Sequence, residues 1–446
     1  MNLPWLVTCS ASLPFKGLVG GGASGCPRLR EWKPMKRMLI ATVLIAGFLA
    51  SMAVAKDYVA QRSAAAAATD FSIAGGKSST VVPFALVDNR IFVKVKLNGK
   101  GPFNFILDTG ADAVVRPELA RDLGLHSEIN GEGFGAGEKP VLTGTTHVAQ
   151  IQIGDVRIDD EPFSVMSFAD TPHVFGSVPV DGVIGRPVFE RLVVAIDYER
   201  HLVTLTLPQR FQYHGTGTVV AFERRSDRNL PIIQGELDGV VGKFGIDTGT
   251  RSAVLLYGPF IEGNHLRAKY APKVEGITGW GFGGPVRSQV ARAQSLKLGP
   301  VEAHNLVVRL SLQRSGALTS TALAGLVGPD VLDQFNVVFD YSRRHIIFEK
   351  NSQYGIPDTY DRSGMWLGQD GKYFEVMDLT PGGPAAQAGL RVGDRILAID
   401  GRSTDKLLLP DVRLQLRQAP PSKQLKLWVR SPRGQRTVVL TLRDLV

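Results

Sequence analysis

The stretch Phe105-Ile-Leu-Asp108-Thr109-Gly110-Ala111 decides the fold, together with a second stretch that repeats it later in the chain, Phe244-Gly-Ile-Asp247-Thr248-Gly249-Thr250. Each is an apolar strand that ends in Asp-Thr-Gly. One such motif is ordinary, because Asp and Gly often mark the end of a strand. Two in matching contexts indicate a duplicated lobe, and they predict that two carboxylates meet at the lobe interface. Carboxylates a few ångströms apart do not both ionise easily, so they share one proton.

Other landmarks repeat in the same order, as internal duplication requires. Leu97-Asn98-Gly99 and Leu237-Asp238-Gly239 are hairpin-turn signals that precede the two Asp strands. The later pairs are Ile151–Gly154 with Leu296–Gly299, Gly182–Gly185 with Gly325–Gly328, and Val194–Tyr198 with Val338–Tyr341. We therefore interpret residues 81–208 and 216–350 as two copies of one fold.

Both copies are predicted to be mainly β. Apolar and β-branched residues alternate or cluster in short segments such as 92–97, 147–153 and 203–207. Gly and Pro separate these segments at short intervals, which favours small barrels or sandwiches. Short helices are expected at Pro117–Leu123 and Gly185–Leu192.

The two lobes resemble the retropepsin-like and pepsin-like aspartic proteases. The residues that carry the likeness are the two Asp-Thr-Gly motifs and the motifs Val183-Ile184-Gly185 and Leu326-Val327-Gly328, within about residues 81–350. The resemblance implies two tandem β-barrel lobes with one Asp loop each. Family members are homodimers with one motif per chain or single chains with both. This chain has both, so it is expected to be a monomer with an internal pseudo-dimer.

The resemblance implies an aspartic endopeptidase. Asp108 and Asp247 would hold a water between them; one carboxylate takes its proton and the other protonates the oxygen of the attacked peptide carbonyl. This chemistry needs no metal and no organic cofactor. Gly after each Thr lets the backbone approach the carboxylates, since it has no Cβ. The residues expected to support the catalytic loops are Thr109, Gly110, Thr248 and Gly249.

Each lobe is also expected to carry a flap, a β-hairpin over the cleft. The glycine-dense segments Gly131–Gly137 and Gly276–Gly284 suit a hairpin that opens and closes. Neither contains the tyrosine of the pepsin-like flap. The alternative is that the flap aromatics pack against their own barrels. The predicted substrate-binding flap residues are Phe134, Gly135, Trp280 and Phe282.

Residues 361–446 form a different module. The stretch from Thr380 to Gly401, with Pro-Ala-Ala-Gln-Ala-Gly-Leu followed by Gly-Asp-Arg-Ile-Leu-Ala-Ile-Asp-Gly, resembles a bacterial-type PDZ domain. A second helix is expected at Pro410–Gln418, with closing strands at Gln424–Arg430 and Thr437–Leu442.

PDZ domains bind extended chain ends by adding a strand to a sheet edge. The resemblance implies that a C-terminal peptide binds here, for recruitment or regulation. The alternative is that this domain only braces the protease lobes. The predicted carboxylate-binding loop is Met365, Trp366, Leu367 and Gly368, although Gln369 stands where an apolar residue is usual.

The N-terminal region predicts the compartment. Lys36-Arg37, a short apolar run and Ala53-Val54-Ala55 together indicate a secretory signal peptide at residues 35–55. Residues 1–34 are then a doubtful extension, and they contain the only two cysteines, Cys9 and Cys26. A mature chain without cysteine suggests a periplasmic or secreted bacterial protein, with an uncleaved membrane anchor as the alternative. Residues 56–80 are expected to be a flexible linker.

Charge and motif content exclude several other functions. The chain of 446 residues has a formal net charge of +9, and removing residues 1–55 (six Lys/Arg, one Asp/Glu) leaves +9 − 5 = +4. That is no basis for nucleic-acid binding. His-Glu-x-x-His and Gly-x-Ser-x-Gly motifs are absent from the sequence. Three alternatives stay open: the protease, a non-catalytic peptide-binding scaffold on the same lobes, and a dimer through lobe one, against which the intact second Asp-Thr-Gly argues.

Overall fold

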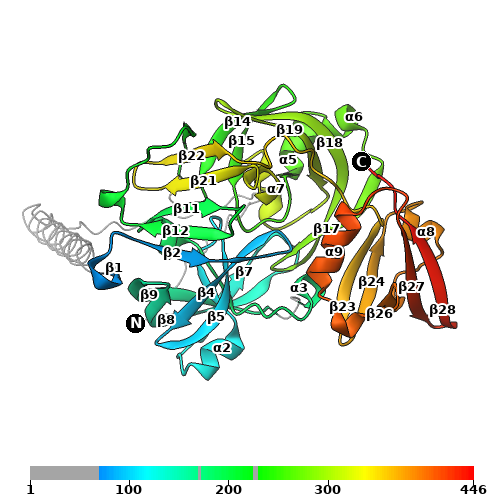
Figure 1. Cartoon of the computed structure of the whole chain (residues 1–446), viewed down its shortest axis with the longest axis horizontal. Helices are drawn as coiled ribbons and strands as arrows, with labels where there is room; N and C mark the ends of the chain where they lie inside the picture. The colour runs from blue at the N-terminus through cyan, green and yellow to red at the C-terminus, as the bar shows by residue number, and fades with distance from the viewer. Residues whose placement is uncertain (1–69, 169–171, 225–229) are drawn as a thin grey trace, which may run out of the picture. The chain divides into compact units, whose positions relative to one another are not determined.

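The computed structural model describes residues 70–168, 172–224 and 230–446. The described part belongs to one compact unit (Figure 1). The predicted extension 1–34 and signal peptide 35–55 lie outside it, as do both cysteines and linker residues 56–69. Among the described helices, none is long and apolar enough to span a bilayer.

Lobe one is a nine-stranded sheet in which β4 (Arg90–Leu97) and β5 (Lys100–Leu107) form a hairpin leading into the first Asp-Thr-Gly. Its other strands are β1 (Phe71–Ile73), β3 (Ala85–Val87), β6 (Ala113–Val115), β7 (Glu128–Gly133), β8 (Val141–Ile153), β9 (Val156–Met166) and β10 (Gly182–Ile184), and its helices are α2 (Pro117–Asp122), α3 (Pro172–Phe175) and α4 (Arg186–Phe189). The two predicted helices are present, and α4 is shorter than expected.

Lobe two repeats this plan with seven strands, and β15 (Val240–Ile246) leads into the second Asp-Thr-Gly. Its other strands are β14 (Ile232–Leu237), β16 (Val254–Leu256), β17 (Val274–Gly281), β18 (Gly284–Leu298), β19 (Val301–Ser311) and β20 (Gly325–Val327), and its helices are α5 (Gly258–Gly263), α6 (Leu266–Tyr270) and α7 (Pro329–Leu332). The expectation of a mainly β, two-lobed fold is confirmed.

A six-stranded sheet joins the two lobes. The sequence analysis treated the lobes as separate and did not predict this sheet. Its order is β13 (Thr218–Ala221), β22 (His345–Lys350), β21 (Phe335–Asp340), β11 (Val193–Asp197), β12 (Leu202–Thr206) and β2 (Ser79–Pro83). β11 of lobe one pairs with β21 of lobe two, with Val194 opposite Phe339. Across this seam the Phe189 and Phe339 rings lie 5.4 Å apart, so the two lobes share one hydrophobic core.

The flexible-linker prediction is wrong from Phe71 onward. β1 pairs with β9, with Phe71 opposite Ile158, and β2 pairs with β12 in the shared sheet. Tertiary pairing thus orders a segment whose alanine-rich beginning suggested a tether.

The C-terminal domain, orange to red in Figure 1, has its own sheet and core. The strand order is β23, β24, β25, β27 and β28, with β26 paired to β25. These elements are β23 (Met365–Asp370), β24 (Tyr373–Leu379), α8 (Pro384–Gln387), β25 (Arg395–Ile399), β26 (Arg402–Ser403), α9 (Leu409–Gln418), β27 (Gln424–Ser431) and β28 (Gly434–Thr441). The second helix and closing strands lie where the sequence predicted them.

Candidate active site

The two Asp loops meet at the interface between the lobes. Asp108 follows β5 and Asp247 follows β15, and each strand pairs in parallel with the apolar-apolar-Gly strand of its own lobe, β10 or β20. The Asp108 N–H donates to Ile184 O at 3.1 Å, and the Asp247 N–H donates to Val327 O at 2.9 Å. A hydrogen bond joins the two carboxyl groups. The structure therefore brings together the two aspartates that the sequence singled out.

The two threonines lock the loops to each other. The Thr109 hydroxyl donates to Ile246 O at 2.7 Å, and the Thr248 hydroxyl donates to Leu107 O at 2.9 Å. Each hydroxyl also accepts the main-chain N–H of the other threonine at 3.1 Å. Both threonines are fully buried, so these bonds have no competition from water. The position of one aspartate is thus fixed relative to the other.

Glycine lets the two loops approach closely. A Cβ at Gly249 would overlap the Asp108 carboxylate, closer than real Cβ contacts come. A Cβ at Gly110 would lie 3.3 Å from Asp108 Oδ1 and 3.5 Å from Asp247 Oδ1, which is tight but less severe. The two glycines occupy equivalent positions in the two loops, but the space around Gly249 is tighter than that around Gly110.

The carboxyl pair has a preferred protonation state. Loss of solvent around it raises the pKa of both groups, and the nearby Asp247 charge raises the pKa of Asp108 further, well above its usual range. Asp247 Oδ1 accepts the N–H groups of Gly249 at 2.8 Å and Thr250 at 3.2 Å, whereas Asp108 Oδ1 accepts, among the described residues, one main-chain N–H, that of Gly110 at 2.7 Å. Two donors favour the charged form, so the shared proton lies on Asp108.

A buried ion cluster next to the loops escaped the sequence analysis. Arg90 Nε donates to Gly249 O at 2.9 Å, and Asp88 holds Arg90 at 2.7 Å, Arg251 at 2.8 Å and Arg413 at 3.4 Å. Burial would raise the pKa of Asp88, but the three guanidinium groups outweigh it and lower that pKa to about 2. Asp88 stands in an Asp-Asn pair, which is typical of a surface turn. The only sequence signal was the position of Arg251 just after the second motif.

The flap hairpins, β7–β8 and β17–β18, meet at their tips. The Gly137 N–H donates to Phe282 O and the Lys139 N–H to Gly283 O, both at 3.0 Å. A Cβ at Gly135 would lie 2.6 Å from Phe282 Cβ, so this close backbone contact requires glycine.

Of the three aromatic residues predicted to line the flaps, two are packed against lobe one and one is exposed. Phe282 packs against Phe168 of lobe one at 5.1 Å between ring centroids, and Trp280 packs against His173 of lobe one at 5.4 Å. They therefore pack against the opposite lobe rather than their own barrel. Phe134 is 59% exposed.

Comparison with known families agrees with this geometry. A family model described as aspartyl protease matches residues 93–188, and one described as PDZ domain matches residues 375–430. The chain thus contains an aspartyl protease domain of the retropepsin-like kind, followed by a C-terminal PDZ domain. A search of curated proteins found no match. The protease match lies within lobe one, so the assignment of lobe two rests on its equivalent strands, loop and hydrogen bonds.

The structure places the predicted carboxylate-binding residues of the PDZ domain in a strand rather than in a loop. Met365, Trp366, Leu367 and Gly368 belong to strand β23, which pairs along its length with β24. The loop before it is Asp361–Gly364, where Asp361 Oδ1 accepts the N–H groups of Ser363 at 2.9 Å and Gly364 at 2.8 Å. The N–H groups of Ser363 and Gly364 are thus already bonded within the loop.

The edge of the PDZ sheet is covered by lobe one. β23 is an edge strand, and α3 contacts both β23 and α9. Arg413 of α9 donates to the carbonyl oxygens of His173 and Val174 at 2.7 Å and of Leu367 at 2.5 Å. A Cβ at Gly176 would lie 2.9 Å from Leu409 Cβ at the start of α9. A segment of lobe one therefore occupies the groove between β23 and α9.

The PDZ domain also contacts the flap of the protease. Asp378 of β24 accepts the Ile277 N–H of β17 at 2.6 Å and binds Arg287 of β18 at 3.0 Å. Asp378 thus links the PDZ sheet to the β17–β18 hairpin of lobe two.

Within the described residues, no group of three or more His, Cys, Asp or Glu side chains is arranged to hold a metal ion.

Proposed function

We propose that this protease is an aspartic endopeptidase that hydrolyses peptide bonds in unfolded or extended chains. The observation that carries the proposal is the hydrogen-bonded pair of Asp108 and Asp247, held by reciprocal threonine bonds between two lobes. Both carboxyl groups must be held rigidly to position a water molecule against a peptide carbonyl.

The asymmetry of the pair assigns a role to each aspartate. Asp247, the ionised partner with two N–H donors, takes a proton from a water bound between the carboxyls. The water oxygen attacks the peptide carbonyl carbon, and Asp108 gives its proton to the developing carbonyl oxygen. Asp247 then protonates the leaving nitrogen, and Asp108 takes a proton back from a hydroxyl of the tetrahedral intermediate as the C–N bond breaks. The products are a carboxylic acid and an amine, and Asp108 is again protonated and Asp247 ionised.

Substrate entry in this mechanism requires the flap tips to separate. The two main-chain hydrogen bonds between the flaps would break, and the freed groups of Phe282 and Gly283 could bind an extended substrate backbone. Such hairpin opening is a usual gating step in enzymes with lids.

Cleavage of an unfolded protein by the wild type is expected to follow a bell-shaped pH profile. Activity needs one proton on the pair, so it falls at low pH as Asp247 is protonated and at high pH as Asp108 loses its proton. Because both pKa values are raised, both limbs should lie above the range of an isolated aspartate. The measurement is kcat/KM on a quenched peptide library from acidic to alkaline pH. Folded protein with no cleavage at any pH would contradict the proposal and favour the scaffold.

We also propose that the PDZ domain binds a free C-terminal peptide in competition with α3. PDZ domains bind a peptide as an added strand at the edge of their sheet. In this structure α3 of lobe one lies at that edge, against β23 and α9. A peptide added to β23 would displace this segment, whose His173 packs against Trp280 of the flap. Peptide binding to the PDZ domain would thereby change the packing of the lobe-two flap.

Gly176→Leu should tighten binding of a labelled peptide with a free C-terminus by about tenfold, because it pushes the segment out of the groove and raises the competent fraction. Fluorescence polarisation measures the Kd. The matched control is Gly371→Leu, also at a positive φ but with nothing within 4 Å of its Cβ. Equal affinities in the two variants would argue that the domain only braces the lobes.

Export to the periplasm or secretion is a further proposal, supported by the sequence of residues 35–55 alone. An uncleaved anchor is its alternative.

A further inference from the structure

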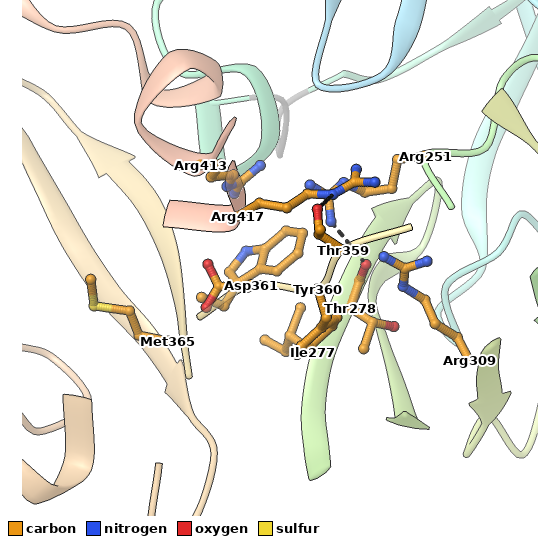
Figure 2. A pocket seen from close by; sticks show the side chains of 11 residues that line it. Arg251, Ile277, Thr278, Arg309, Thr359, Tyr360, Asp361, Met365, Arg413 and Arg417 are labelled. Atoms are coloured by element: carbon orange, nitrogen blue, oxygen red, sulfur yellow. Dashed lines mark hydrogen bonds between the residues drawn. The ribbon is translucent and has the colours of Figure 1, made fainter. Parts of the chain in front are cut away.

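A cavity of about 40 Å³ lies where lobe two meets the PDZ domain. It is several times larger than the roughly 10–15 Å³ that one water needs. Strands β17, β19 and β23, helix α9 and the connection 359–361 contribute to its wall (Figure 2). Four of the residues that line it are arginines: Arg251, Arg309, Arg413 and Arg417.

Three of these arginines are bound in part by protein acceptors. Arg251 is bound by Asp88 at 2.8 Å, and Arg417 by Asp358 at 2.6 Å and Asp330 at 2.8 Å. Arg413 donates to main-chain carbonyls of α3 and β23, as described above. These contacts fix the guanidinium groups around the cavity.

Arg309 of β19 is different. It is only 5% exposed, and its Nε and Nη1 have no hydrogen-bond partner among the residues that the structure describes. Burial and the nearby charge of Arg251 lower its pKa, and the charges of Asp330 and Asp358 offset this only in part. An unpaired buried guanidinium is strongly disfavoured unless an anion compensates it.

The other unpartnered groups of the lining are also donors. Arg413 Nε and Trp366 Nε1 are buried and have no acceptor in the described parts of the chain. The carboxylate in the lining, Asp361, already accepts from Ser363 and Gly364. Four nitrogen atoms on the two sides of the cavity therefore lack an acceptor among the described residues, which suits a ligand that only accepts hydrogen bonds. A water has two acceptor sites, whereas a carboxylate or phosphate group has more.

We propose that this cavity is a binding site for a small oxyanion, with Arg309 as its principal donor. Guanidinium groups match carboxylate and phosphate oxygens in geometry and in charge. Because its wall includes β17 and β19 on one side and β23 and α9 on the other, the bound anion ties the PDZ domain to lobe two. The shared chemistry is the oxyanion, which free phosphate or a small carboxylate can supply.

Thermal unfolding of the full chain tests the proposal at constant ionic strength, with inorganic phosphate or acetate replacing chloride. The wild type should show a saturable rise in Tm with at least one of the two, and the comparison of the two identifies the source. Arg309→Met should lose this rise, and its anion-free Tm should equal or exceed that of the wild type, because an uncompensated charge is gone. The control Arg402→Met removes an exposed arginine and should respond as the wild type does.

Calorimetric titration with the same anion keeps the proposal falsifiable if Arg309→Met folds poorly. Arg309→Lys, which retains the charge, should bind at least tenfold more weakly than the wild type but still measurably. A Tm response that Arg309→Met retains in full would overturn the proposal, since it would reflect general salt effects. The absence of any response in the wild type would mean that water fills the cavity.

Discussion

Asp108→Asn and Asp247→Asn should each lower kcat/KM for peptide cleavage by about 10³-fold, without loss of the fold. An amide cannot take the water proton at Asp247, and it cannot give a proton to the carbonyl oxygen at Asp108. Asn retains the shape of the side chain, so the 2.7 Å bond from the Gly110 N–H to position 108 can persist. The measurement is single-substrate kinetics at the pH optimum of the wild type. Cleavage that survives in either variant would refute the shared-proton mechanism.

For Asp108→Asn, the dependence of Tm on pH distinguishes a loss of catalysis from a loss of the folded structure. The pKa of Asp108 is raised on folding, so the folded chain holds this proton more tightly than the unfolded chain. The contribution of this protonated group to the free energy of unfolding is therefore fully present at low pH, and it is lost as the pH rises through the raised pKa. Asp108→Asn removes that loss, so its Tm should exceed the wild-type Tm at alkaline pH and approach it at acidic pH.

Asp197→Asn is the matched control for both measurements. Asp197 ends β11 of lobe one and accepts the Arg200 N–H in a turn at 2.9 Å, away from the dyad. Its replacement should leave kcat/KM within about twofold of the wild type, as surface substitutions usually do.

Gly249→Ala should lower kcat/KM by about 10²-fold or more, whereas Gly110→Ala should have a much smaller effect. The new methyl group at position 249 would overlap the Asp108 carboxylate, so one of the two loops must shift. Displacing a reacting group by about 1 Å is enough for a loss of this size. At position 110 the methyl group would lie 3.3 Å from Asp108 Oδ1, and small adjustments can relieve that contact.

The two glycine variants are each other's control, because both add one methyl group to an equivalent loop. Kinetics with one peptide at several pH values, beside thermal melts, would separate a displaced dyad from an unfolded one. Equal losses in both variants would contradict the asymmetric loop packing described here.

Local signals in the sequence determined the position of each Asp-Thr-Gly loop. Asp-Thr-Gly after an apolar strand identified Asp108 and Asp247, and the repeated order of landmarks indicated the two-lobed fold. The reason is that these elements depend on short-range patterns, namely strand periodicity and turn residues. The PDZ helix and hairpin were predicted for the same reason.

Only the tertiary structure decided how distant segments meet. The Asp88 turn has an ordinary surface signature, yet three arginines from separate parts of the chain converge on it. Likewise, Met365–Gly368 became a paired strand whose outer edge is covered by α3 of lobe one. Burial, charge compensation and edge coverage depend on which surfaces are juxtaposed, and sequence periodicity carries no information about the partner. The motifs therefore determined the chemistry available to this protein, whereas packing between lobes and domains decided which groups surround it.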